Sequence, residues 1–348
     1  MNPFILAILL SALGLGTAIT LTSSHWLIAW VGLELNTVAI LALMTRQAHP
    51  WAVEALTKYF LIQAAAGATL LFAATTNAWI TGQWGIHQMT HPIQAAIATL
   101  ALAMKVGLAP THFWLPEVLQ GLDLTTGLIL STWQKLAPFA LLLQLPQHNP
   151  TMLIMLGLSS TLIGGWGGLN QTKLRKILAY SSIAHFGWMM LVMQYSPSLS
   201  ILTLSLYILM TASTFLTFKL AKATSINQLA ASSFKYPALT ALTPLTLLSL
   251  AGLPPLTGFM PKWLIVQELT KQSLSPTATL AIMSALLSLY FYLRLSYAMT
   301  LTSPPNTIAG TTPWRLHSST LSLPLATSIT ATLLLLPMTP ALLSLVTP

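Results

Sequence analysis

The sequence predicts an all-α membrane protein that crosses the bilayer many times, and composition is the first observation behind this prediction. Of the 348 residues, 55% are hydrophobic and 5% are charged, whereas charged residues make up about 25% of a soluble domain. A spanning helix needs about 20 apolar residues, so this length holds about ten to twelve spans and no soluble domain. We therefore expect residues 1–348 to form a single membrane domain.

Charge and cysteine content exclude several classes of function. The net charge is +9, but the basic residues lie at the ends of apolar segments, which indicates membrane orientation rather than nucleic-acid binding. The sequence has no cysteine, which excludes disulfides and thiolate ligation of an iron–sulfur cluster or a structural zinc ion. We expect no cofactor and no metal in this chain.

About eleven apolar segments, separated by polar, Pro-rich or basic joints, are expected to span the membrane. They are residues 3–21, 25–45, 53–78, 93–117, 123–145, 150–169, 175–195, 199–221, 238–270, 277–300 and 322–345. The first has neither the basic start nor the cleavage site of a secretory signal, and no Arg-rich transit peptide is recognisable. This pattern predicts synthesis in a prokaryote or inside an organelle.

The distribution of basic residues predicts the orientation. Counted from the first joint, the even-numbered joints hold or adjoin most of them, namely Arg46, Lys58, Lys173, Arg175, Lys176, Lys222, Lys235 and Arg315. By the positive-inside rule these joints and the N-terminus face the cytoplasm or matrix. An odd number of spans then puts the C-terminus on the opposite side.

Two of the predicted spans are expected to break inside the membrane. Residues 105–116 read KVGLAPTHFWLP, and their two prolines cannot donate to the carbonyl four residues back. Residues 252–263 read GLPPLTGFMPKW and repeat the glycine, the leucine and two prolines of the stretch from Gly107 at identical offsets. Chance recurrence in a chain with 22 prolines is the alternative explanation.

Five spans separate the two breaks, which predicts two five-helix repeats inverted in the membrane, each with a broken fourth helix. The first repeat is expected to cover residues 1–148 and the second residues 149–301. Residues 302–348 then form a joint and one extra C-terminal helix.

Four ionisable residues fall near the middle of predicted spans: Glu34, Lys105, Lys135 and Lys262. Each lies about nine or more residues from the nearer polar joint, or about 14 Å along a helix. A lysine at the centre of a span costs about 2.5 to 3.5 kcal/mol on insertion scales, so these groups imply mutual pairing or a wet path. Buried ion pairs that only lock helices together are the structural alternative.

A buried lysine with a movable carboxylate partner can act as a proton carrier. Burial weakens the hold of a lysine on its proton, and a neighbouring carboxylate strengthens it. Glu34 is the only carboxylate deep in a predicted span, so Lys105, beside the first break, is its expected partner. Lys135 adjoins a further expected hinge, where Pro138 frees the carbonyl of Gln134.

Two histidines are candidates for a proton relay, because imidazole titrates near neutral pH. His112 lies inside the first break, and His185 lies among hydroxyl side chains in the stretch AYSSIAHFGWMM. A buried structural role is the alternative for both. His87 and His91 have i, i+4 spacing, but they flank a joint and lack a third ligand, so no metal site is predicted there.

Two motifs resemble the hallmark segments of a known family. KVGLAPTHFWLPEVLQG and KLRKILAYSSIAHFGW are similar to segments of the antiporter-like membrane subunits of respiratory complex I and of their relatives in multisubunit cation/proton antiporters. WVGLELNT, around Glu34, and AGLPPLTGF read the same way. The likeness covers nearly the whole chain and matches a shortened mitochondrial form with about eleven helices.

The resemblance implies a role for each buried ionisable residue. Glu34 matches the membrane glutamate of the family, Lys105 and Lys135 match its lysines in the first repeat, and Lys262 matches the position at the second broken helix. His112 and His185 match histidines on the hydrophilic axis of the family. Some relatives carry a glutamate at the position of Lys262, so the direction of proton exit there stays open.

The resemblance also implies a function and a location. It predicts a proton-translocating subunit of an NADH:ubiquinone-reducing enzyme in the mitochondrial inner membrane, with the N-terminus in the matrix and the C-terminus in the intermembrane space. Flavin, iron–sulfur clusters and ubiquinone are expected in partner subunits. The expected partners are other membrane-arm subunits, further antiporter-like subunits among them, and bilayer lipid such as cardiolipin, with no nucleic acid.

Alternatives from other classes remain at this point. One is a stand-alone cation/proton antiporter of the same fold, which uses its own ion gradient. Another is a structural subunit braced by locked ion pairs. A quinone-binding enzyme is the third, but no second cluster of convergent polar residues supports it.

Overall fold

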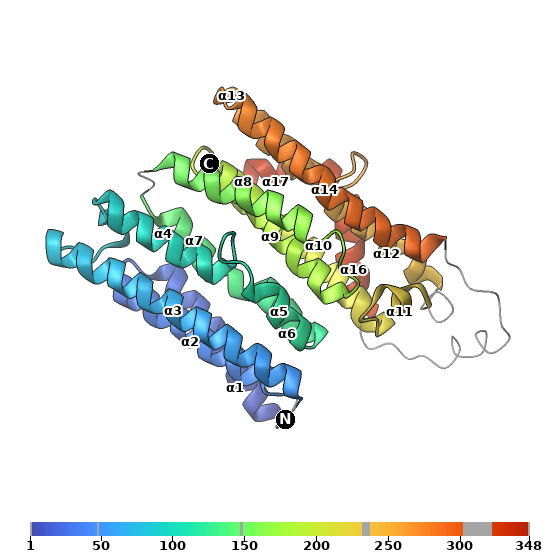
Figure 1. The fold of residues 1–348 in the computed structure, drawn as a ribbon, viewed down its shortest axis with the longest axis horizontal. Helices are drawn as coiled ribbons and strands as arrows, with labels where there is room; N and C mark the ends of the chain where they lie inside the picture. Colours follow the sequence, from blue (N-terminus) through green and yellow to red (C-terminus); the bar gives the residue numbers. More distant parts are fainter. Residues whose placement is uncertain (1, 47–48, 147–148, 232–236, 302–321, 347–348) are drawn as a thin grey trace. The chain divides into compact units, whose positions relative to one another are not determined.

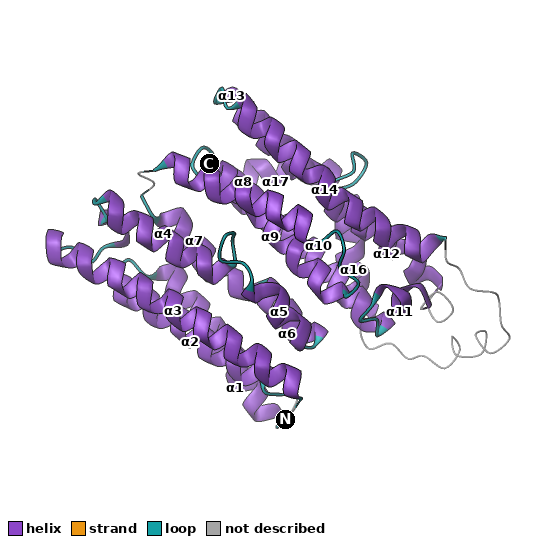
Figure 2. Ribbon diagram, in the orientation of Figure 1, coloured by secondary structure: helices purple, strands orange, loops and turns teal. Residues whose placement is uncertain are grey.

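The computed structural model describes residues 2–46, 49–146, 149–231, 237–301 and 322–346, and these residues fold into helices joined by turns (Figure 1). No strand occurs among these described residues, as Figure 2 shows. The chain divides into two compact units, Met1–Leu156 and Gly157–Pro348. The predicted all-α fold is therefore confirmed for the described ranges.

The helices of the first unit begin at favourable residues. They are α1 (Pro3–Thr22), α2 (Trp26–Met44), α3 (Pro50–Thr81), the short η1 (Ile86–Gln88), α4 (Pro92–Val106), α5 (Trp114–Gly121), α6 (Leu124–Ser131) and α7 (Trp133–Gln144). Proline occupies the first turn of α1, α3 and α4, where its missing N–H costs no helical hydrogen bond. The next helix, α8 (Pro150–Gly167), continues across the boundary between the units.

The described part of the second unit also consists of helices joined by turns. Its remaining helices are α9 (Leu174–Val192), α10 (Pro197–Ala221), α11 (Ile226–Ala231), α12 (Pro237–Ala251), α13 (Phe259–Lys271), α14 (Ser275–Thr300), α16 (Ser322–Leu334), η4 (Leu336–Met338) and α17 (Thr339–Val346).

Several helices are long and apolar enough to cross a membrane. Within the described ranges there are five of these, α1, α2, α3, α10 and α14, and the bent pair α16 and α17 would add a sixth. Only 22% of the most apolar 18-residue stretch of α1 is buried, so most of that helix needs an apolar surrounding outside the chain.

Both predicted breaks are present, and both use the same backbone device. The chain leaves α4 at Gly107 (φ 86°) and α12 at Gly252 (φ 85°), a left-handed conformation that favours glycine. In each case the N–H after the glycine bonds to the carbonyl five residues back, at 2.9 Å and 3.3 Å respectively. Residues 107–113 and 252–258 then lead to α5 and α13.

In each unit an unbroken helix packs against both halves of the broken one. In the first unit α3 contacts α4 and α5, and in the second unit α10 contacts α12 and α13. An unbroken neighbour can hold two half-helices in line, because it packs against side chains on both sides of the break. Packing against an unbroken helix thus stabilises each break.

The predicted span 123–145 differs from the structure. It consists of two helices, α6 and α7, which meet at Thr132 (φ −112°, ψ −69°), and Pro138 lies inside α7. The hinge expected at Pro138 was therefore assigned to the wrong residue. A proline ring displaces the carbonyl four residues back, here at Gln134, so its effect falls within one turn of the interruption.

The last predicted span, 322–345, is also not a single straight helix. α16 and α17 are bent by 68° relative to one another. Pro337 lies at the bend, where it removes a helical donor. Two of the basic residues used to predict orientation, Lys235 and Arg315, lie outside the described residues.

Candidate functional site

In the first unit, two neighbouring helices turn polar side chains towards one another. Trp30, Glu34 and Thr37 lie on one face of α2, at positions i, i+4 and i+7. Tyr59 and Gln63 share a face of α3 with the next residue in that row, a glycine at position 67. α2 and α3 pack together, so the two rows meet.

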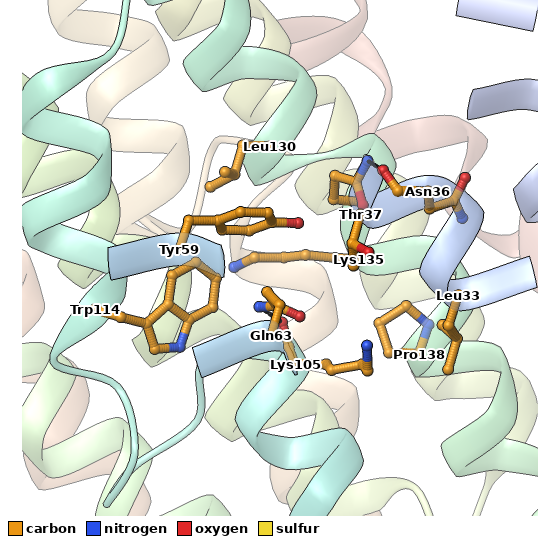
Figure 3. A pocket seen from close by; sticks show the side chains of 11 residues that line it. Leu33, Asn36, Thr37, Tyr59, Gln63, Lys105, Trp114, Leu130, Lys135 and Pro138 are labelled. Carbon is orange, nitrogen blue, oxygen red and sulfur yellow. Dashed lines mark hydrogen bonds between the residues drawn. The ribbon is translucent and has the colours of Figure 1, made fainter. Parts of the chain in front are cut away.

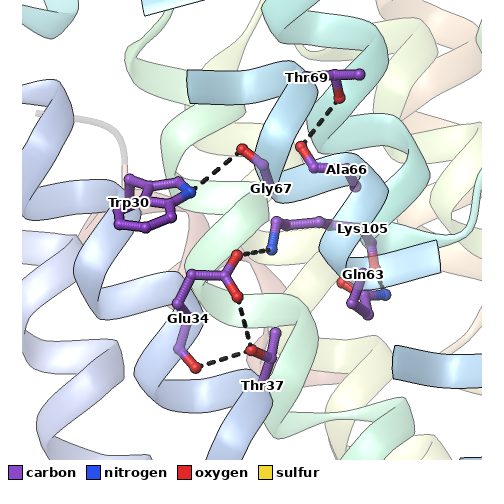
Figure 4. Close-up of polar contacts among 8 residues, drawn as sticks. All are labelled: Trp30, Glu34, Thr37, Gln63, Ala66, Gly67, Thr69 and Lys105. Carbon is purple, nitrogen blue, oxygen red and sulfur yellow. Dashed lines mark hydrogen bonds and ion pairs between the residues drawn. The ribbon is translucent and has the colours of Figure 1, made fainter. Parts of the chain in front are cut away.

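The centre of this arrangement is an ion pair. The Lys105 Nζ lies 3.1 Å from the Glu34 Oε1, and the two side chains are 3% and 28% exposed (Figure 4). The Thr37 hydroxyl lies 3.0 Å from the other carboxylate oxygen, Oε2. The contact expected between the only deep carboxylate and the lysine beside the break is therefore present.

The break in α4 positions Lys105 for this contact. Lys105 lies in the last turn of α4, where its carbonyl has no partner within the helix. The Gln63 Nε2 donates to that carbonyl at 3.4 Å, and the Trp114 Nε1 donates to the Met104 carbonyl at 3.2 Å. The negative end of the helix dipole also favours a cation at this position.

A cavity of ≈ 20 Å³ lies beside the lysine of this ion pair, Lys105, and Figure 3 shows the side chains that line it. This volume is enough for an enclosed water molecule, which needs about 10 to 15 Å³ and polar partners. It is lined by Leu33, Asn36, Thr37, Tyr59, Gln63, Lys105, Trp114, Leu130, Gln134, Lys135 and Pro138.

Two predicted site residues, Lys105 and Lys135, thus line one cavity. Lys135 is 3% exposed, and its ammonium end points towards the side chains of Tyr59 and Trp114 (Figure 3). Two lysines beside one space large enough for water form an arrangement through which a proton can pass between buried groups.

His112 also belongs to the first unit, but it does not line this cavity. It is buried inside the break, its Nδ1 lies 3.3 Å from the Pro110 carbonyl oxygen, and its ring packs on Phe113 at 4.3 Å between centroids. His112 therefore follows Lys105 closely in the sequence, but its side chain does not reach the cavity.

The other two predicted site residues lie in the second unit. The Lys262 Nζ reaches back from α13 and donates to the Ala251 carbonyl at 2.7 Å, at the C-terminal end of α12. The His185 ring on α9 lies 5.5 Å from the Tyr207 ring on α10. Lys262 also lines an apolar pocket of ≈ 320 Å³ in this unit.

A separate charged bridge joins α3 to the second half of the first broken helix. The Lys58 Nζ lies 2.6 Å from the Glu54 Oε1 and 2.6 Å from the Glu117 Oε2, and the three side chains are 40%, 55% and 51% exposed. The lysine thus pairs with a glutamate one turn earlier on α3 and also links α3 to α5.

Sequence reasoning missed several residues of this site: Tyr59, Gln63, Trp114 and Gly67. One signal was available for three of them, because Tyr59, Gln63 and Gly67 recur every four residues along one helix. Trp114 follows the break directly, but nothing local indicates that its indole satisfies a carbonyl ten residues earlier.

The chain matches two family models. Residues 23–288 match the model described as NADH:quinone oxidoreductase/Mrp antiporter, transmembrane region. Residues 289–343 match the model of the NADH dehydrogenase subunit 2 C-terminus.

Full-length relatives agree with these matches. The chain is 69% identical to NADH-ubiquinone oxidoreductase chain 2 of Tetraodon nigroviridis, over 99% of both chains. It is 65% identical to the protein of the same name from Salmo salar, over 100% of both chains.

Solved structures share the fold. A chain of respiratory complex I from Thermus thermophilus, solved with bound aureothin, is 29% identical with a TM-score of 0.87, covering 99% of this chain and 80% of that one. A chain of the Mrp complex from a Dietzia species has a TM-score of 0.81 at 18% identity, over 95% of this chain and 74% of that one. At that identity the likeness concerns the fold alone.

Proposed function

This chain belongs to the NADH:quinone oxidoreductase/Mrp antiporter transmembrane family, and we propose that it is a proton-translocating core membrane subunit of NADH:ubiquinone oxidoreductase. Its curated relatives carry the name of chain 2 of that enzyme, and complex I supplies a structural neighbour. The chain thus contributes to an H⁺-translocating NADH:ubiquinone reductase, and we propose that it carries no redox centre of its own.

One observation carries the proposal, namely the ion pair between Glu34 and the buried Lys105 at the end of a broken helix. A charge in this environment is costly, and a paired lysine beside a water-sized cavity is suited to proton transfer. Lys135, on the same cavity, is the next site for the proton.

The proposed mechanism works through the position of the Glu34 carboxylate. When it contacts Lys105, the pair favours the protonated lysine, and when it withdraws, the unpaired buried ammonium is disfavoured and releases its proton. The water-sized cavity that both lysines line is then the candidate route for that proton to Lys135, and His112, which lies outside the cavity lining, is a candidate relay within the break. Redox chemistry in partner subunits supplies the energy, since moving one charge against 100 mV costs about 2.3 kcal/mol.

His185 and Lys262 are proposed to serve the same pathway in the second unit. Lys262 faces a helix C-terminus, where the dipole stabilises its charge, as it does for Lys105. The matching breaks, each flanked by an unbroken helix, support two inverted repeats over residues 1–148 and 149–301, with residues 302–348 added. About eleven spans follow, once the broken and bent pairs are each counted as one.

The proposed setting is the mitochondrial inner membrane, with the N-terminus in the matrix and the C-terminus in the intermembrane space. The positive-inside distribution of lysine and arginine supports this orientation. Other membrane-arm subunits, including further antiporter-like ones, are the proposed partners, and cardiolipin is a candidate lipid. Flavin, iron–sulfur clusters and ubiquinone are assigned to partner subunits.

The test is a Lys135→Met variant of the assembled complex, measured as protons pumped per NADH oxidised in sealed vesicles. We expect this ratio to fall, because methionine keeps an unbranched, flexible side chain one atom shorter than lysine but cannot carry a proton. Lys271→Met is the control, since that lysine is exposed on α13 and, among the described residues, forms an ion pair with a neighbouring glutamate at 3.6 Å alone. An unchanged ratio in an intact Lys135→Met complex would sink the proposed role.

The alternative, a stand-alone cation/proton antiporter of the same fold, predicts exchange by the purified chain alone in liposomes. We expect none, because the high-identity relatives are named as chains of an NADH-ubiquinone oxidoreductase. Exchange without partner subunits would favour the antiporter.

A further inference from the structure

Gly67 on α3 lies against the Glu34 carboxylate. A Cβ built on Gly67 would clash directly with the Glu34 Oε1, the oxygen that contacts Lys105, and would lie 3.2 Å from the carboxylate carbon. The carboxylate therefore occupies the space that any side chain at position 67 would fill.

The backbone at Gly67 is itself held in place from α2. The Trp30 Nε1 donates to the Gly67 carbonyl at 3.2 Å (Figure 4). Trp30 precedes Glu34 by one helical turn, so the same face of α2 supplies both the carboxylate and the donor that fixes its neighbour. Gln63, one turn before Gly67, adds a second anchor through its bond to the Lys105 carbonyl.

From this geometry we infer that Gly67 is a positioning residue that controls whether Glu34 can contact Lys105. The inference rests on the proposed function, because it concerns the same ion pair. α3 is held at Gly67 and one turn before it, whereas a glutamate side chain rotates about several bonds, so an added methyl group displaces the carboxylate rather than the helix.

The direction of the expected effect is opposite to that of an ordinary glycine replacement. Alanine inside a helix normally stabilises relative to glycine, because it lowers the conformational entropy of the unfolded chain. Gly14 in α1 offers a matched control, because a Cβ there meets nothing within 4 Å. A loss of the ion-pair contact and of proton pumping in Gly67→Ala that is absent in Gly14→Ala therefore isolates the steric effect on the carboxylate.

The experiment compares complexes carrying Gly67→Ala, Gly14→Ala and the double change Glu34→Asp with Gly67→Ala. For each complex, the distance between the Lys105 Nζ and the acidic carboxylate is measured by cryo-electron microscopy, and protons pumped per NADH are measured in vesicles. We expect Gly67→Ala to move the carboxylate from 3.1 Å to beyond about 4 Å, the limit of an ion pair. We also expect the pumping ratio to fall, with Gly14→Ala unchanged in both measurements.

The two readouts separate the inference from the proposed function. A Gly67→Ala complex that keeps the 3.1 Å contact overturns the positioning role, whatever its pumping ratio. A displaced carboxylate with an unchanged ratio supports the positioning role and instead overturns the proposed role of Glu34 in pumping.

The double variant covers the case in which Gly67→Ala fails to assemble. Aspartate is one methylene shorter than glutamate, which makes room for the added methyl group. Recovered assembly in the double variant supports the steric account, and continued failure overturns it.

Discussion

Replacing Glu34 with glutamine removes one charge from the ion pair while keeping its shape. The two atoms are 3.1 Å apart, so unit charges there attract by about 5 kcal/mol at an effective dielectric constant of about 20. Leaving a buried charge without its partner typically costs about 3 to 5 kcal/mol. A proton step that depends on the carboxylate charge therefore slows by about 150-fold for a loss of about 3 kcal/mol.

The assay for this prediction measures NADH:ubiquinone turnover and vesicle acidification in the assembled complex. We expect both to fall sharply in Glu34→Gln. The matched control is Glu54→Gln, the same chemical change at a carboxylate that is 55% exposed and whose lysine keeps a second partner, Glu117. Such exposed pairs contribute less than about 1 kcal/mol, so the control stays near the parent values. Equal, small effects in the two variants would refute the reasoning.

Two further predictions concern the break itself. Gly107→Ala places a residue with a side chain in the left-handed region at φ 86°, which costs about 1 to 2 kcal/mol. The midpoint temperature of thermal inactivation should therefore be lower than that of Gly14→Ala. Equal midpoints would contradict a backbone requirement at Gly107. Lys58→Met removes both ion pairs that link α3 to α5 through Lys58, at a cost below about 2 kcal/mol in stability. Amide hydrogen exchange in α5 should therefore become faster. Unchanged exchange would show that Lys58 does not anchor that helix.

The breaks were predictable because glycine and proline restrict the backbone locally. Gly107 and Gly252 occupy positions that need a positive φ, and prolines follow both. The interruption at Thr132 has neither residue at the joint, so only the distant Pro138 hinted at it. The bend near Pro337 could have been predicted by the same reasoning as the two breaks.

Part of the site was predictable for a different reason, namely scarcity. With one carboxylate deep in any span, Glu34 had few possible partners, and Lys105 adjoins a break in the same unit. The support from Gln63, Gly67 and Trp30 depends on the register in which α2 packs on α3. This register depends on tertiary packing. The sequence therefore shows which residues share one face of each helix, but not which residues of the two faces lie opposite one another.

The Thr37 hydroxyl has a consequence for how the ion pair can open. Its Oγ1 lies 3.0 Å from the Glu34 Oε2 and 2.8 Å from the Glu34 backbone carbonyl, yet a hydroxyl group has one hydrogen to donate. When the carboxylate swings away, that hydrogen can turn fully to the carbonyl, so no buried donor is stranded. The Thr37 hydroxyl therefore keeps a partner when the pair opens, and the cost of opening falls on the two separated charges, the Glu34 carboxylate and the Lys105 ammonium.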